Sequence, residues 1–520
     1  MNNLQKTLLN EIPEFRDYTL NFINGNMSTM QYKEFAAAYG VYSQSNDKQL
    51  FLIRFRTSCG VISRAQLHTI YQMAHKHNLN YIHITTRQSI QLQDLDMDTI
   101  VDIMQQGIEK DLYTKGSCGN FPRNVTLSPL SGVDLEESFD VTPYALDTDK
   151  YFLNKISTYN LPQKLKVSYS NSQKDSAHAT NQDVGFIATI KDNKPYFEVY
   201  VGGSLGKDPK IGLKLSKLIK PSDVLFYIEG VTEFLKKEGN YENKYKAGVR
   251  YMIEYLGEDE FLKRLYSYID KQKQYVSLKI NPAPINYKKQ GSEIKLNNPR
   301  LFKQKQPGLY SVYIHPLGGM YKLKDLKCLL KELDKIKNPF IRIGMMQDIY
   351  ILNLDGQEAK KILDTTECVN GSTALENSIS CIGFPICQMG ICNSQKMLSE
   401  IITYFKINSK DRQNMKVMPP IYISGCKNSC GLQQNGYIGL IGKMKSIDKI
   451  PVNCFEITIN GFQDIDDFNS REFVGCFKDC DIPPMLYKIS EELIEMNIDF
   501  TTFVNNYRDK FDKIIDKYKI

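Results

Sequence analysis

Four cysteines stand in two pairs late in the chain, on segments rich in glycine. Five residues separate Cys381 from Cys387, and three residues separate Cys426 from Cys430. Glycine permits backbone conformations that let a segment curl around a bound group. Four thiolates are the usual ligand set of a [4Fe–4S] cluster, so the two pairs predict such a cluster.

Three other interpretations of the cysteines compete with this one. Zinc sites favour pairs with two to four intervening residues, which the wider pair does not match well. Cys476 and Cys480 repeat the three-residue spacing, but they lack flanking small residues and lead toward a helix, so we interpret them as structural. Inert buried thiols are the remaining alternative for all of them.

Four basic residues could hold an anion. Arg87 lies in TTRQSIQ, Arg123 in GNFPRNV, and Lys164 and Lys166 lie in LPQKLKV. Alternate positions of an extended segment point the same way, so the two lysines can face one cavity. Each of these residues alone is more often a surface or ion-pair residue, and only the combination indicates an anion site.

The elements that must position these residues include an internal repeat. Residues 81–95 and 340–354 match at a constant spacing, and both alternate apolar and polar residues as a half-buried strand pair does. The shared residues are Ile82, Ile84, Gln88, Ile90 and Leu95, which recur as Ile341, Ile343, Gln347, Ile349 and Leu354. Arg87 of the first copy corresponds to Met346 of the second.

The context of the repeat also recurs. A strand at 50–56 or 309–315 leads to a turn at Gly60 or Gly318, and a helical pattern follows at 64–77 or 323–336. Two copies are too few for a solenoid, so we expect a pseudo-twofold duplication in which each copy supplies half of a shared central sheet. Residues 280–308, rich in Pro, Lys and Asn, are expected to link the halves.

The bulk composition is that of an ordinary globular protein. The chain has 520 residues, 42% hydrophobic and 24% charged, and a net charge of +7. The positive excess is either a solvated surface or a docking face for an acidic partner. With no basic arm, secretory signal or long apolar stretch, we expect a cytoplasmic protein that binds neither nucleic acid nor membrane. In that compartment the cysteines are ligands or free thiols.

The cysteine spacing with SGCKNSCG, and the basic residues in the same order, resemble the siroheme-dependent sulfite and nitrite reductases. The resemblance runs from Gly40 to the helix after Pro484. It implies a siroheme as well as the [4Fe–4S] cluster, with Cys430 as the ligand shared by both. It also implies that Arg87, Arg123, Lys164 and Lys166 are catalytic, and that the side chains contacting the siroheme carboxylates are Arg54, Arg56, Gln88 and Asn124.

Two departures from the family pattern lie near these residues. Ser58, Cys59 and Gly60 stand where family members usually have PGG, and Cys118 lies five residues before Arg123. We interpret both thiols as buried and structural.

The reaction that the resemblance implies is the six-electron reduction of sulfite to sulfide. No flavin or nicotinamide motif is present, and VGGSLG at 201–206 is no dinucleotide fingerprint, so electrons are expected from ferredoxin or a similar small acidic donor. Lys166 completes the K-x-K typical of sulfite reductases, whereas nitrite reductases more often have K-x-N. Reduction of nitrite to ammonia is the first alternative. A non-catalytic iron–sulfur redox protein is the second, against which the four cations argue.

The expected fold is mixed α/β (α+β) with a duplicated sulfite/nitrite reductase architecture, in a chain that acts as a monomer. We predict an N-terminal extension at 1–40 and a central ferredoxin-like domain at 41–112 plus 285–367. A first siroheme-binding lobe is predicted at 113–284 and a second lobe with the cluster at 368–520. The two cofactors should lie where the lobes meet.

Overall fold

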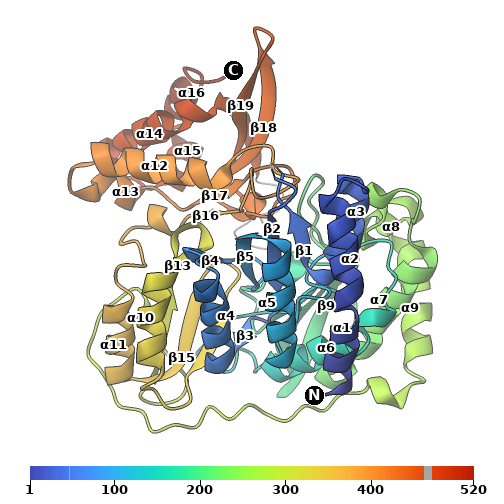
Figure 1. The fold of residues 1–520 in the computed structure, drawn as a ribbon. Coiled ribbons are helices and arrows are strands. Elements are labelled where there is room, and N and C mark those ends of the chain that lie inside the picture. The colour runs from blue at the N-terminus through green and yellow to red at the C-terminus, as the bar shows by residue number, and fades with distance from the viewer. Residues whose placement is uncertain (46, 462–470) are drawn as a thin grey trace.

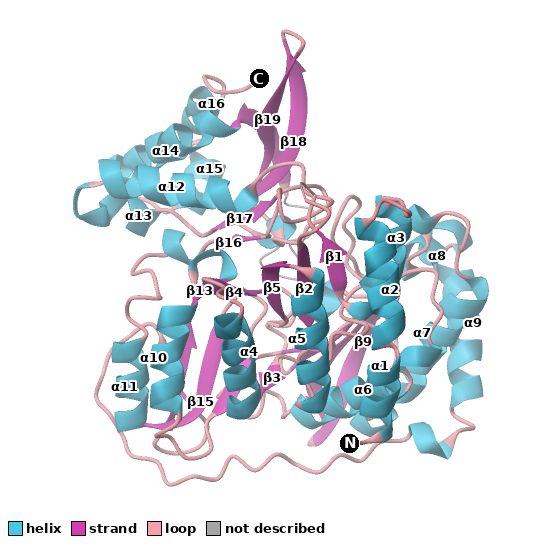
Figure 2. Ribbon diagram, in the orientation of Figure 1, coloured by secondary structure: helices cyan, strands magenta, loops and turns pink. Residues whose placement is uncertain are grey.

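The computed structural model describes residues 1–45, 47–461 and 471–520. Three N-terminal helices, α1 (Asn3–Asn10), α2 (Ile12–Ile23) and α3 (Thr29–Ala36), precede four five-stranded sheets. Helices α1 and α2 contact α5 (Met97–Glu109) and so extend the layer that covers the central sheets (Figure 2). The mixed α/β class expected from the sequence is confirmed.

The internal repeat is confirmed strand by strand. The first copy contains β2 (Phe51–Phe55), α4 (Arg64–Lys76), β4 (Tyr81–Ile84) and β5 (Ile90–Leu95). The second contains β12 (Leu309–Ile314), α10 (Leu323–Leu333), β14 (Phe340–Ile343) and β15 (Ile349–Asp355), followed by α11 (Gly356–Thr365). Pairing is equivalent in the two copies, with Arg54 opposite Gln91 and Tyr313 opposite Tyr350.

The expectation of one shared central sheet is wrong, because the copies build two sheets that exchange a strand. The short β3 (Val61–Ile62) leaves the first copy and pairs with β14, while β13 (Met320–Lys322) leaves the second and pairs with β4. The sheets are β1-β2-β5-β4-β13, with β1 at Val41–Ser43, and β11-β12-β15-β14-β3, with β11 at Leu301–Lys303. Glycines with positive φ, Gly60 and Gly318, make the turns that send each strand across.

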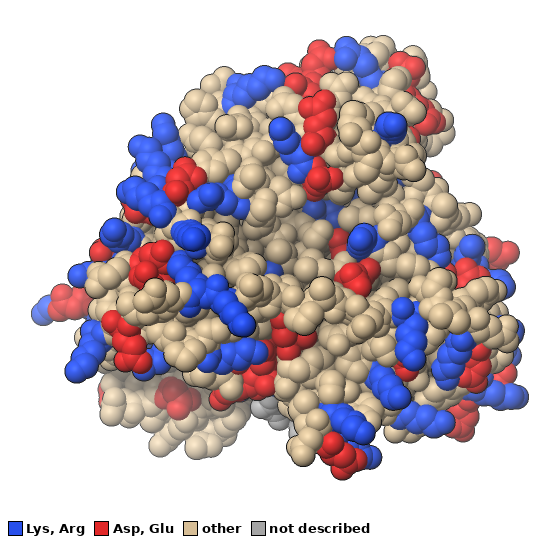
Figure 3. All heavy atoms as spheres, turned by 90° about the horizontal axis from the view of Figure 1, so that it is seen from below, with Lys and Arg blue, Asp and Glu red and all other residues tan. Residues whose placement is uncertain are grey.

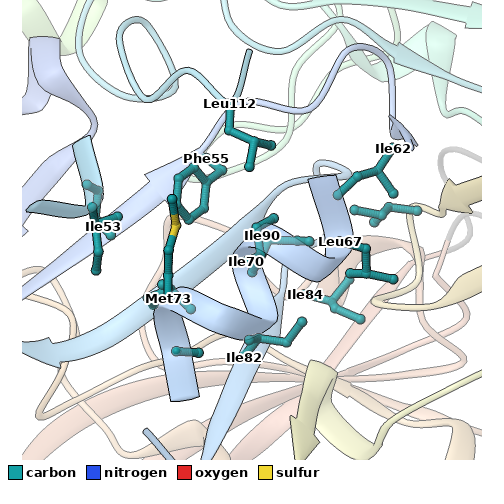
Figure 4. Close-up of a cluster of buried hydrophobic side chains, with 14 of the residues drawn as sticks. Ile53, Phe55, Ile62, Leu67, Ile70, Met73, Ile82, Ile84, Ile90 and Leu112 are labelled. Atoms are coloured by element: carbon teal, nitrogen blue, oxygen red, sulfur yellow. The ribbon is translucent and has the colours of Figure 1, made fainter. Parts of the chain in front are cut away.

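One hydrophobic core joins the two central sheets. Figure 4 shows Ile62 of β3 beside side chains of α4, β4 and β5. Residues from both copies, such as Ile84 and Ile343, are fully buried in the same cluster. Helices α4, α10 and α11 lie on one side of the sheets (Figure 2). Burial of this shared core fixes the two copies relative to each other.

The duplication extends to the regions 113–284 and 368–520, called the first lobe and the second lobe below. The first-lobe strands are β6 (Thr126–Leu127), β7 (Val167–Ser170), β8 (Val184–Lys191), β9 (Lys194–Val201) and β10 (Leu213–Lys214). The second-lobe strands are β16 (Ile379–Ser380), β17 (Ile421–Ser424), β18 (Ile438–Ile447), β19 (Ile450–Ile459) and β20 (Glu472–Lys478). In each lobe the first three strands are parallel and the fourth is antiparallel.

Helices flank each lobe sheet. The first lobe has α6 (Thr142–Asn154), α7 (Val224–Glu238), α8 (Val249–Leu256) and α9 (Glu258–Gln272). The second has α12 (Ser394–Asn408), α13 (Gln413–Val417), α14 (Ile482–Met496), α15 (Phe500–Asn506) and α16 (Arg508–Ile515). The expected helix at Pro483 is confirmed as α14, which has proline in its first turn.

The expected linker 280–308 runs as an extended loop along the base of the molecule (Figure 1), except that β11 lies within it. The second lobe sits at the opposite end, over the central sheets. The loops after β16 and β17 lie at its boundary with the rest of the chain (Figure 1).

Candidate functional site

The two cysteine pairs meet because they follow neighbouring parallel strands. Cys381 directly follows β16, and Cys426 lies two residues after β17. Parallel strands end at the same edge of a sheet, where loops commonly form a site. The loops are tied together at Gly425, whose N–H donates to Cys381 Sγ at 3.1 Å and whose carbonyl accepts from the N–H of Ile391 at 2.9 Å.

The four thiols share one electrostatic environment. Burial, followed by the neighbouring Cys430, raises the pKa of Cys381 to about 12. Burial and Cys430 also raise the pKa of Cys387, which backbone N–H groups oppose. Burial raises the pKa of Cys426 to about 11. Thiolates so crowded need positive charge between them, which bound iron would supply.

The backbone N–H groups around the cysteines suit an iron–sulfur cluster. Among the residues described here, no three His, Cys, Asp or Glu side chains are drawn together around one point as a metal ion requires. A four-iron cluster holds one thiolate at each iron corner of a cube, so its ligands need a wider spacing than those of zinc. The N–H groups that point at Cys381, Cys387 and Cys426 are typical neighbours of cluster sulfur.

The cations gather at one place from separate elements. Arg54 lies on β2, Arg87 in the turn between β4 and β5, and Arg123 just before β6. Lys164 and Lys166 lie before β7 on either side of the buried Leu165, which bridges Pro122. This alternation aims both lysines to the same side, as the sequence predicts.

The cations repel one another strongly. Burial, then Arg123, lowers the pKa of Arg87 to about 9. Burial, then Arg87 and Lys164, lowers the pKa of Lys166 to about 7. The pKa of Lys164 is lowered for the same reasons. Positive groups held together at such a cost mark a site built to receive an anion.

The cations and the thiols belong to one site. Burial works to lower the pKa of Arg54, yet negative charge at Cys118, Tyr42, Cys430 and Cys387 raises it. Cys430 also acts on Lys164, and Thr86 Oγ1 donates to the Cys430 carbonyl at 2.7 Å. Cys430 is the exposed member of the four cysteines, whereas Cys426 is buried. It is therefore the thiol available to a second group on the cation side.

Arg56 and Gln88, which the sequence analysis expects on a cofactor, are committed to partners within the protein. Arg56 forms a buried ion pair with Asp149 at 2.8 Å and donates to the Pro122 carbonyl at 2.7 Å. Gln88 Nε2 donates to the carbonyls of Leu127 and Ile343 at 2.8 and 2.7 Å. Both side chains brace the loops that carry the cations.

Asn124 and the two unusual cysteines complete the surroundings. Asn124 Nδ2 donates to the Arg87 carbonyl at 3.0 Å, but its Oδ1 and Arg87 Nε are buried without a partner. Cys59 packs in the apolar core of the first lobe, as expected of a structural thiol. Cys118 is fully buried beside Tyr42 and Arg54 and thus lies at the site.

Sequence reasoning missed two residues that hold the cations. Gln182 Oε1 accepts from Arg87 Nη1 at 2.7 Å, and Asp183 Oδ2 accepts from the Lys166 backbone N–H at 2.9 Å. Both precede β8, whose parallel pairing with β7 brings them to the lysines. Their one sequence signal is a polar NQD ahead of an apolar strand.

The donor set fits both cofactors that the resemblance implies. Four thiols with N–H support fit a [4Fe–4S] cluster. A macrocycle with eight carboxylates needs several cations that donate hydrogen bonds to it. Arg87 Nε is buried without a partner and is one nitrogen that could donate in this way. Cys430 is the exposed thiol whose charge acts on both Arg54 and Lys164.

Two family models match parts of this chain. The family described as "Nitrite/Sulfite reductase ferredoxin-like half domain" matches residues 42–109, and "Nitrite and sulphite reductase 4Fe-4S domain" matches residues 118–273. The second match covers the first lobe, whereas the four cysteines lie in the second.

Relatives that match this chain over most of their length carry related names. Sulfite reductase (ferredoxin) 1 of Mycolicibacterium paratuberculosis is 22% identical over 80% of this chain and 74% of that protein. Ferredoxin–nitrite reductase of Leptolyngbya laminosa is 24% identical over 78% of each. The solved NirA protein of Mycobacterium tuberculosis superposes with a TM-score of 0.78 at 20% identity, covering 95% of this chain and 93% of that one. Over most of its length the chain is therefore similar to the nitrite and sulfite reductases.

Proposed function

We propose that this chain is a siroheme and [4Fe–4S] enzyme that reduces sulfite to sulfide with six electrons from ferredoxin. The observation that carries the proposal is the meeting of the exposed Cys430 with the cations Arg54 and Lys164. A redox protein without a substrate has no use for cations that repel each other beside its cluster. A reductase of an anion needs them.

Each group of residues has a task in this proposal. Cys381, Cys387, Cys426 and Cys430 would hold the cluster, and Cys430 would also hold the siroheme iron. When bound, these groups supply single electrons and the iron to which the anion binds. Arg87, Arg123, Lys164 and Lys166 bind and orient the anion and neutralise charge as oxygen leaves.

Lys166 can also handle protons. Its pKa of about 7 means that Nζ can both carry and release a proton at neutral pH. Each oxygen of sulfite must leave as water, so a proton held at this atom is of direct use. Arg54 and Asn124 are proposed to face the carboxylates of the macrocycle, and Arg56 and Gln88 to support them from behind.

The choice between sulfite and nitrite rests on Lys166. A second lysine in K-x-K favours the anion with more charge and more oxygens, which is sulfite. Relatives of this chain are named for either anion. Nitrite reduction to ammonia is therefore the second candidate function.

The donor is proposed to be a small acidic ferredoxin, for which several relatives are named. The chain carries a net charge of +7, but Lys and Arg are interspersed with Asp and Glu over the face in Figure 3. The face in Figure 3 therefore presents no surface of a single charge sign, and we propose that the donor binds at the boundary near the exposed Cys430.

We propose that the enzyme acts in the cytoplasm, as a monomer that carries both cofactor sites. None of the twelve cysteines forms a disulfide, which suits a reducing compartment. Within the described ranges, no helix has the length and apolar character needed to cross a membrane.

The proposal is tested by the visible spectrum and by turnover of the purified protein. Siroheme gives an intense Soret band and red-region bands that a cluster alone does not give. Reduced ferredoxin should then support sulfite consumption, measured beside nitrite with the same donor. A cluster spectrum without siroheme bands, and no turnover of either anion, would leave only the iron–sulfur redox protein.

A further inference from the structure

The carboxylate of Asp183 sits among the cations of the site. The charged groups that act most strongly on Lys166 are Arg87, Lys164, Asp183 and Arg123, and of these only Asp183 is negative. Asp183 is 9% exposed, and its Oδ2 accepts from the Lys166 backbone N–H at 2.9 Å. The Lys166 carbonyl in turn accepts from the N–H of Val184 at 3.0 Å. Asp183 and Lys166 are thus fixed to each other through the backbone.

The second lobe shows that the strand pair does not need this contact. Val184 begins β8 opposite Val167 of β7, and Ile438 begins β18 opposite Ile421 of β17. The residues that precede these strands correspond, so Asp183 matches Tyr437 and Lys166 matches Pro420. Proline has no N–H to donate. The same parallel pairing forms without the carboxylate, which occurs only where the cations gather.

We propose that Asp183 is a positioning residue for the reaction, which fixes Lys166 through its backbone N–H and places a negative charge among the surrounding cations. This inference rests on the proposed function, because it concerns the proton and charge that Lys166 brings to the bound anion. Asp183 acts through Lys166 and need not touch the substrate.

The electrostatics have the required sign. Burial, Arg87, Lys164 and Arg123 lower the pKa of Lys166, and Asp183 is the group that raises it, to a balance of about 7. Burial raises the pKa of Asp183 itself, which Lys166, Lys164 and Arg87 oppose. Removal of the Asp183 charge would therefore lower the pKa of Lys166 below 7. A larger fraction of the amine would then be neutral at the pH at which the enzyme must bind an anion.

The first test is the pH profile of Asp183→Asn in the cofactor-loaded enzyme. Asparagine keeps an oxygen for the Lys166 N–H and removes only the charge. With sulfite, the alkaline fall in kcat should move to lower pH by about one unit, the usual effect of a close charge. At acid pH kcat should approach that of wild type, and siroheme content and Tm should not change. A uniform loss at every pH, or an unmoved profile, would overturn the proposal.

Two further variants isolate the charge. In Lys166→Arg the side chain stays protonated at all working pH values, so adding Asp183→Asn should shift nothing further. A persisting shift would mean that Asp183 acts on another group. Tyr437→Phe, at the corresponding place in the second lobe, is the matched control and should keep the wild-type profile.

A readout independent of turnover comes from chemical labelling. An activated ester acylates only a neutral amine, so labelling of Lys166 at pH 6, read by peptide mass spectrometry, should rise about fivefold in Asp183→Asn for a one-unit shift. Equal labelling would refute the inference even if the enzyme is active. A wild-type protein that reduces neither sulfite nor nitrite would instead refute the proposed function, whatever the labelling shows.

Discussion

The two lobes share a backbone plan but carry different chemistry. Cys381 N donates to the Ile423 carbonyl at 2.9 Å, and Ser128 N makes the corresponding bond to the Tyr169 carbonyl at 3.0 Å. Ser128 therefore occupies in the first lobe the place of Cys381 in the second. By the same strand register, Ser172 and Ser176 occupy the places of Cys426 and Cys430.

The serines also differ from the cysteines in geometry. The hydroxyls of Ser128 and Ser176 are in direct contact at 2.7 Å, which closes the space that a cluster would fill. Serine hydroxyls are hard, weakly acidic ligands with little affinity for iron–sulfur chemistry. The lobe that matches the 4Fe-4S family description at 118–273 is thus the one in which serines occupy the places of Cys381, Cys426 and Cys430.

The central sheets show the opposite asymmetry. Arg54 of the first copy corresponds to Tyr313 of the second, and Arg87 corresponds to Met346. The ring centroid of Tyr313 lies 5.2 Å from that of Tyr350 in a tilted arrangement, and neutral side chains occupy in the second copy the two places that Arg54 and Arg87 hold in the first. The duplication supplies a symmetric frame, and the cations of one half meet the thiols of the other. One site results where symmetry would allow two.

The largest expected effect comes from the thiols. Replacement of Cys381, Cys387, Cys426 or Cys430 by serine should abolish the cluster signal and turnover. Serine, which stands at three of the corresponding positions in the first lobe, has little affinity for iron–sulfur clusters. Cys476→Ser and Cys480→Ser are the controls and should retain the cluster. Iron analysis and the visible spectrum measure the outcome. Full iron content in Cys426→Ser would contradict the ligand assignment.

A smaller effect is expected from the cations. Arg123→Gln or Lys164→Gln should reduce kcat with sulfite by about two to three orders of magnitude, the usual cost of removing a preorganised charge. Siroheme content should stay near that of wild type, since several cations remain. Lys174→Gln, a surface lysine of the same lobe, is the matched control. Unchanged turnover at full siroheme content would show that the substituted residue points away from the anion.

Substrate preference should respond to Lys166 alone. Sulfite sheds three oxygens and nitrite two, so more negative charge develops during sulfite reduction. Lys166→Asn should then lower kcat/KM for sulfite more than for nitrite, by about ten- to a hundredfold for the loss of one charge-assisted contact. Steady-state kinetics with both anions and one reduced donor measure this difference. Equal losses would remove the residue-level support for sulfite.

Local patterns predicted much of the frame, because alternating apolar residues such as Ile82 and Ile84 encode strands directly. The exchange of β3 and β13 was not predictable, since strands of two or three residues carry no periodic pattern. The duplication of the lobes was not predictable from the sequence, because the two copies share few residues. Gly185 and Gly439, at the same register position, are among those that they share.

The site divides in the same way. The spacing of the cysteines can be read directly from the sequence. The alternation in K-x-K likewise predicts that Lys164 and Lys166 point to the same side. The role of Arg56 depends on Asp149, which is 93 positions away in sequence, so an ion pair there could not be anticipated. The contact of Asp183 with Lys166 likewise depends on the pairing of β8 with β7. Roles that depend on contacts between distant segments could not be predicted from the sequence.

The smallest expected effect sharpens the comparison of the lobes. If the first-lobe loop is purely structural, Ser176→Ala should cost only the hydroxyl contact with Ser128, or about 1 kcal/mol in the free energy of unfolding. Turnover and iron content should stay at wild-type values, whereas Cys430→Ala, its counterpart, should abolish both. Urea unfolding and steady-state assays measure the two effects side by side. A tenfold loss of turnover in Ser176→Ala would mean that the first lobe takes part in the reaction through this serine. The loss of one hydrogen bond of this strength would not by itself displace the cations of the site.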